Sequence, residues 1–85
     1  MTDLGTLGGT FSFAVAINDL GQVVGSSTTT TGEIHAFRWQ AGVMTDLGTL
    51  GGTSSEAHAI NGRGRIVGHS ETAAGVTHAV LWRVF

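Results

Sequence analysis

The same ten residues occur twice in this chain, and this repeat constrains the fold more than any other feature. Met1–Thr10 and Met44–Thr53 both read MTDLGTLGGT, and the second copy follows the first by 43 residues. A fixed period of this length is typical of propellers, solenoids and repeat arrays. We therefore expect two structural units, at residues 1–43 and 44–85. Without a gap, the same offset aligns further identical residues, among them Asn18 with Asn61, Gly25 with Gly68, His35 with His78 and Trp39 with Trp82.

The pattern within each unit predicts short strands joined by tight turns. The chain has 14 glycines, is rich in Thr, Val and Ile, and shows no helical periodicity. Four antiparallel strands in about 43 residues make one β-propeller blade. A β-trefoil uses units of similar length, but it needs a third copy. The expected strands are Thr2–Leu7, Phe13–Asn18, Gln22–Ser27 and Ile34–Gln40, with Glu56–Asn61, Arg65–Ser70 and Thr77–Arg83 as copies of the last three.

The sequence repeat and the expected blade do not begin at the same strand. The first strand of each repeat is expected to be the last strand of the preceding blade. The chain begins with the strand expected at Thr2–Leu7 and ends with the one at Thr77–Arg83, so the second blade lacks its fourth strand. Two blades cannot close a ring within one chain. They also leave apolar faces and a strand edge in water, which favours association.

These arguments predict an all-β chain of two four-stranded propeller-type blades that closes into a β-propeller by head-to-tail assembly. Met1–Leu7 of one chain would complete the open blade of the next. Since propellers contain roughly 4 to 8 blades, a homotrimer with about six blades and a homotetramer with about eight both fit. The expected assembly residues are Thr2, Leu4 and Leu7 in the donated strand, and Leu81 and Trp82 in the blade that receives it.

Composition limits the classes of partner. Charged residues make up 12% of the chain, the net charge is −2, and there is no cysteine. The absence of a basic patch argues against nucleic acid and anionic membranes, and no disulfide framework can form. The low charge content indicates that part of the surface is covered by another chain. No apolar run in the chain is long enough to span a bilayer, and we expect no secretion signal within this chain.

Several strings, in the same order in both units, carry a family resemblance. Asp3–Gly9 (DLGTLGG), Ala16–Asn18 (AIN), Gly21–Gly25 (GQVVG) and His35–Phe37 (HAF) with Trp39 resemble the HAF repeat family of bacterial extracellular proteins. The second unit differs slightly, with Val80 in place of Phe and Arg65-Ile66 in place of Gln-Val. The resemblance covers nearly the whole chain. It implies a secreted or cell-surface protein and no enzymatic activity.

The polar residues do not predict a catalytic or cofactor site. Asp3 and Asp46 occupy equivalent repeat positions, which favours a structural role, and no G-x-S-x-G motif occurs. Glu56, His58 and His69 could line a central channel, but only in alternate blades, and we predict no metal site there. His35 and its copy are expected to donate to neighbouring backbone carbonyls.

The loops are the better candidates for binding. Gly8–Ser12 and Thr28–Gly32 should lie at one end of the first blade, with Gly51–Ser55 and Glu71–Gly75 in the same place on the second. Variable loops on a rigid scaffold are where recognition usually occurs. Two functions therefore stay open: a self-assembling structural or interaction ring, and a multivalent carbohydrate-binding ring. The candidate ligand residues are Phe11, Phe13, Thr29, Thr30 and Glu71, with Trp39 and Trp82 as aromatic platforms if they are not core.

Overall fold

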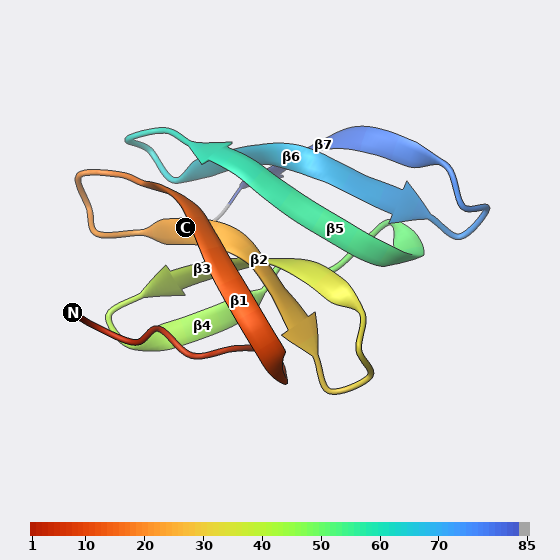
Figure 1. Cartoon of the computed structure of the whole chain (residues 1–85). Helices are drawn as coiled ribbons and strands as arrows, with labels where there is room; N and C mark the ends of the chain where they lie inside the picture. Colours follow the sequence, from red (N-terminus) through yellow and green to blue (C-terminus); the bar gives the residue numbers. More distant parts are fainter. Residues whose placement is uncertain (84–85) are drawn as a thin grey trace.

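Residues 1–83 are described by the computed structural model, and they form two antiparallel sheets without a helix. The two sheets lie one above the other (Figure 1). This confirms the all-β prediction. Sheet A has the order β1-β2-β3-β4 and contains β1 (Gly8–Ile17), β2 (Val23–Thr29), β3 (Ile34–Gln40) and β4 (Val43–Asp46). Sheet B has the order β5-β6-β7 and contains β5 (Gly51–Ile60), β6 (Arg65–Thr72) and β7 (Thr77–Arg83).

The fourth strand of sheet A comes from the second copy of the ten-residue repeat. β4 pairs antiparallel with β3, so that Met44 lies opposite Trp39 and Thr45 opposite Arg38. Sheet B has three strands, and within residues 1–83 no strand pairs with the outer edge of β7. The chain therefore crosses from the first sheet to the second inside the repeated segment, as the phase of the repeat predicted.

The strand predicted at Thr2–Leu7 is wrong. Residues 1–6 form no strand, and Leu7 makes only an isolated parallel bridge to Thr29. The chain bends after Asp3 because its carboxylate accepts a hydrogen bond from the Gly5 amide at 2.9 Å, and Gly5 has a φ of 87°. Side-chain to backbone bonds of this kind compete with strand pairing.

The expected corner and loop at Gly8–Ser12 are also wrong, because these residues begin β1. The pairing of β1 with β2 changes register between Gly8 and Ser12 and again between Ala14 and Ala16. β5 and β6 show the same two irregularities, between Gly51 and Ser55 and between Ala57 and Ala59. β1 and β5 are thus long and bulged, and a bulge increases the local twist.

The core lies between the two sheets. Val24 and Ala36 from sheet A pack with Ala57 and Ile66 from sheet B, and all four side chains are buried. Ala16, Leu47, Ile60 and Trp82 pack around them while remaining half-buried. Within residues 1–83 the other buried hydrophobic side chains are Val23 and Phe37, so the apolar core is small and each of its contacts matters for stability.

Gly25 and Gly68 are required by the bulge that both sheets share. A Cβ on Gly25 would collide with the carbonyl oxygen of Phe13, and one on Gly68 with that of Glu56. We expect Gly25→Ala and Gly68→Ala each to lower the free energy of unfolding by about 2 kcal/mol, because neither backbone can move away without breaking strand pairs. Urea unfolding measures this. Gly62→Ala is the control, since a Cβ there meets nothing within 4 Å; an equal loss in all three variants would contradict the prediction.

Candidate functional site

The two sheets present the same face of the repeat in different surroundings. In sheet A this face carries Ala16, Val24, Ser26, Ala36 and Arg38; we call it the packed face because sheet B covers it. The equivalent residues of sheet B, 43 positions later, are Ala59, Val67, His69, Ala79 and Leu81. We call this second set the open face.

Four of the five side chains on the open face are apolar and exposed, and the fifth is the half-buried His69. Val67 is 47% exposed, whereas its equivalent Val24 is 0% exposed. Leu81 lies opposite Val67 in the strand register and is 49% exposed. Ala79 is exposed too, although Ala36 is completely buried. An exposed apolar sheet face next to an unpaired strand edge is typical of an interaction surface.

The first unit carries an apolar pocket that corresponds to the part of the core contributed by the second unit. It has a volume of about 400 Å³. We call it the leading pocket. Four of its residues are the equivalents of Leu47, Ala57, Ile60 and Ile66, which form the sheet B half of the core. The leading pocket is lined by Thr2, Leu4, Ala14, Val15, Ala16, Ile17 and Val23.

The second repeat satisfies the backbone at the edge of β3. The Leu47 amide donates to the Ala36 carbonyl at 3.0 Å, and the Ala36 amide donates to Ser55 Oγ at 2.9 Å. Ser55 in turn donates to the Gly48 carbonyl at 2.7 Å, and Trp82 Nε1 donates to the Leu47 carbonyl at 3.0 Å. The bond between Ala36 and Ser55 joins the two sheets directly and is buried at both ends, whereas the bonds to Gly48 and Leu47 attach sheet B to the segment after β4 and are partly buried. Ala79, the equivalent of Ala36, lies on the edge strand β7.

The first residues of the chain already have the conformation of the segment that makes these contacts. Gly5 accepts from Ser12 Oγ at 2.6 Å, as Gly48 accepts from Ser55. The Leu7 amide donates to Ser27 Oγ at 2.8 Å, as Leu50 donates to Ser70. The segment at residues 3–12 is therefore held on sheet A in the way that residues 46–55 are held on sheet B. Serines at equivalent positions do this in both units: Ser27, Ser55 and Ser70 are buried and Ser12 is half-buried. The sequence analysis missed them, although the repeated Ser12/Ser55 and Ser27/Ser70 pairs were visible.

The predicted assembly residues are spread over these surfaces. Thr2 and Leu4 line the leading pocket, and Leu7 is half-buried beside Ser27. Leu81 lies on the open face. Trp82 is on the other side of β7, where it packs against the core of its own chain.

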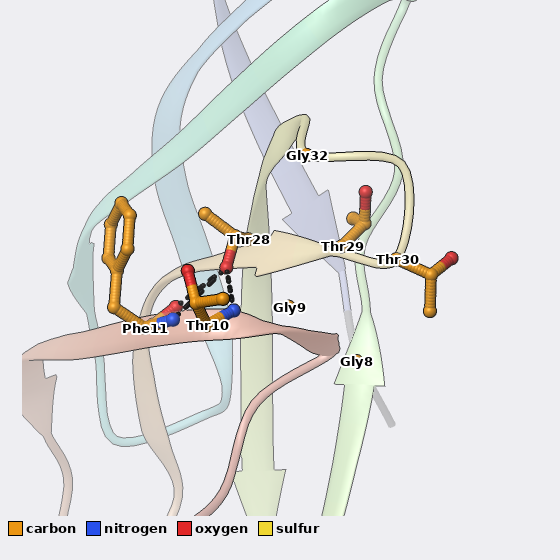
Figure 2. Close-up of a pocket in the computed structure, with 8 residues that line it drawn as sticks. All are labelled: Gly8, Gly9, Thr10, Phe11, Thr28, Thr29, Thr30 and Gly32. Atoms are coloured by element: carbon orange, nitrogen blue, oxygen red, sulfur yellow. Dashed lines mark hydrogen bonds between the residues drawn. The ribbon is translucent and has the colours of Figure 1, made fainter.

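Part of the predicted ligand set lines a second pocket. This pocket has a volume of about 390 Å³. Figure 2 shows Phe11 on one side of it and Thr29 and Thr30 on the other, with Thr10 and Thr28 between them. Thr28 lies beneath it; its Oγ1 accepts hydrogen bonds from the amides of Thr10 and Phe11 at 2.8 and 3.2 Å. The pocket combines an exposed aromatic ring with hydroxyl groups.

The other predicted ligand residues lie elsewhere. Phe13 stacks on Phe11, with 6.0 Å between the ring centroids, but does not line the pocket. Glu71 belongs to the second unit, where Oε1 accepts from Thr53 Oγ1 at 3.1 Å. Trp39 and Trp82 are half-buried and also lie outside the pocket.

Three of the four histidines make polar contacts. His58 Nε2 lies 2.7 Å from His69 Nδ1, and His69 Nε2 lies 3.0 Å from Glu56 Oε2. Among residues 1–83, no group of three or more acidic or histidine side chains is arranged to hold a metal ion. The expected bond from His35 to a backbone carbonyl is wrong, because His35 contacts the carboxylates of Asp46 and Glu33 at 2.9 and 3.2 Å.

Comparison with known protein families, with curated proteins and with solved structures gives no match for this chain. In the part of the chain that the structure describes, no helix is long and apolar enough to cross a membrane.

Ser55 offers a test of the contact between the sheets. We expect Ser55→Ala to lower the free energy of unfolding by about 1–3 kcal/mol, because it leaves the buried Ala36 amide without an acceptor. Ser54→Ala on the same strand is the control and should change stability by less than about 0.5 kcal/mol. Thermal or urea unfolding compares the two; equal stabilities would show that the Ser55 bond contributes nothing.

Proposed function

We propose that copies of this chain assemble head to tail into a closed β-propeller that acts as a structural or interaction ring without enzymatic activity. The open face of one copy would pack against the leading pocket of the next. The leading segment of that next copy would pair with β7 and complete the second sheet. A contact of this kind joins two different surfaces. It forms a closed ring when the rotation from one copy to the next is a whole fraction of a full turn.

One observation carries the proposal: both halves of a second core exist in the chain, and both are exposed. The core within the chain is formed by the packed face of sheet A and by Leu47, Ala57, Ile60 and Ile66. The open face repeats the first half. The leading pocket repeats the second, and Ile17 within it is 68% exposed. Bringing the two together would remove from water the side chains that the repeat buries within the chain, which is a favourable change.

The repeat also sets the size of the ring. Each chain contributes two sheets, so a propeller of roughly 4 to 8 blades contains an even number of them. The even numbers in this range are about four, six and eight blades, and we propose a ring of about six or eight blades, which is a homotrimer or a homotetramer. The resemblance to HAF repeat proteins leads us to propose further that the ring acts outside the cell or at its surface.

The mass of the 85-residue chain in native solution tests this proposal. We expect three or four times 8.7 kDa, and we expect Leu81→Glu to give a folded monomer, because burying a charge in the covered face would be costly. Leu20→Glu is the matched control. Leu20 lies in the turn after β1 and is 61% exposed, so this variant should keep the native mass. A compact monomer of the unchanged chain would refute the ring.

The pocket around Phe11 favours carbohydrate binding as a second candidate function. Sugars are bound where an apolar surface lies next to a few well-placed polar groups. Here the exposed Phe11 ring lies beside the hydroxyls of Thr10, Thr29 and Thr30. In a ring the pocket would recur once per chain, and repeated sites raise avidity without new contacts.

A glycan array followed by calorimetry with the best ligand tests this second candidate. We expect Phe11→Ala to weaken binding about tenfold, which corresponds to about 1.4 kcal/mol. Val76→Ala, in an exposed turn outside the pocket, should leave the affinity unchanged. If no glycan of a broad array binds, the proposal of a ring without this activity is the one that stands.

A further inference from the structure

We infer that Asp3 of one copy binds His78 of the preceding copy, and that this pair fixes the register of the exchanged strand. The inference rests on the proposed ring. It assigns a specific contact to two residues that are both exposed in the single chain.

The template is the junction between β3 and β4. His35 Nδ1 lies 2.9 Å from Asp46 Oδ2, and the His35 side chain is 15% exposed. Asp46 lies opposite Phe37 in the strand register, two positions from His35 along β3. This pair therefore connects the last strand that belongs wholly to the first repeat with the first residues of the second repeat.

The same two residue types are present, unpaired with each other, at the two ends of the chain. His78 is the equivalent of His35, and Asp3 is the equivalent of Asp46. His78 lies on β7, the strand that has no outer neighbour within residues 1–83. If Asp3 follows its equivalent, it lies opposite Val80 of the preceding copy, within reach of His78.

Asp3 is already oriented for this contact. Its Oδ1 accepts a hydrogen bond from the Gly5 amide at 2.9 Å, and Asp46 Oδ1 accepts the equivalent bond from Gly48 at 2.8 Å. In Asp46 this bond directs Oδ2 toward His35. In Asp3 it fixes the carboxylate in the same turn, so little side-chain entropy would be lost on binding.

One difference between the units makes Asp3 more important as a partner of His78 than Asp46 is as a partner of His35. His35 has a second carboxylate, because Glu33 Oε1 lies 3.2 Å from its Nε2. The residue equivalent to Glu33 is Val76, which carries no charge. The residue opposite His78 on β6 is Ser70. Asp3 of the neighbouring copy is thus the acidic group that the repeat assigns to His78.

The pair would also select one register. A strand that slipped by one residue would turn Asp3 to the other side of the sheet, away from His78. Since each contact in the ring contains one such pair, a small effect on one contact is multiplied in the assembly as a whole.

A double-mutant cycle at pH 6 tests the inference on the full chain. Asp3→Asn keeps an oxygen for the Gly5 amide but removes the carboxylate, and His78→Gln removes the imidazole. We expect each to weaken the contact about threefold, which is about thirtyfold for a trimer with three contacts, as measured by analytical ultracentrifugation. The double variant should be no weaker than either single one. Asp19→Asn, an exposed carboxylate in the turn after β1, is the control and should have no effect.

The outcomes separate this inference from the proposal on which it rests. If the unchanged chain forms the ring and the two substitutions act independently, or have no effect, the pair is refuted while the ring stands. If the unchanged chain is a monomer at all concentrations, the ring is refuted and the pair with it. Circular dichroism confirms that each variant keeps the β structure of the chain, because neither residue belongs to the core.

Discussion

The packing of one sheet on the next is the contact on which the rest of this structure depends. Val24 and Ala36 have no exposed surface because sheet B lies over them, and the buried Ala36 amide has an acceptor because Ser55 comes from that sheet. Small sheets of three or four strands depend on a hydrophobic face for their stability in water. Each sheet is therefore stabilised by its neighbour along the chain, and every repeat offers one surface to the unit before it and another to the unit after it.

Serine hydroxyls make this contact possible without a continuous ladder of backbone bonds. After β4 the Leu47 amide still donates to the Ala36 carbonyl, but the next bridge is at Leu50, so the amides that follow Leu47 need side-chain acceptors. Ser70 accepts from the Leu50 amide, and Ser27 accepts from Leu7 in the first unit. Both serines are buried, where an unsatisfied polar group would be costly. Serine side chains thus hold the segment after Asp3 and the equivalent segment after Asp46 in place. Only the second of these segments follows a paired strand, β4.

The repeat made much of the fold predictable, because periodicity and alternation depend on residues close in sequence. It gave the strands β2, β3, β6 and β7 to within a few residues, and it placed the fourth strand of the first sheet in the second repeat. The errors arose where a side chain competes with the backbone. Asp3 bends a segment that reads as a strand, and the bulges at Ala14–Ala16 and Ala57–Ala59 follow from register shifts that alternation does not reveal. The partner of His35 was missed because Asp46 is 11 residues away. Which residues share a pocket also depends on contacts between distant parts of the chain. Of the predicted ligand residues, only Phe11, Thr29 and Thr30 line one pocket.

The packed face of sheet A and the open face of sheet B carry different residues at two equivalent positions. In the proposed ring, the contact between copies would therefore differ from the contact within the chain. Ser26 is 1% exposed on the packed face, and its equivalent on the open face is His69, whose imidazole lies between His58 and Glu56. A side chain of that size does not fit the volume that Ser26 occupies. In the proposed ring, the sheet that covered the open face would therefore have to leave more room at this point than sheet B leaves above sheet A. Leu81 in place of Arg38 changes a second position on this face, where a charged residue is replaced by an apolar one. The two kinds of contact are thus not interchangeable, and this difference favours one order of sheets around a ring. A chain with two identical units would lack that order, because either sheet could exchange with its copy in a neighbour.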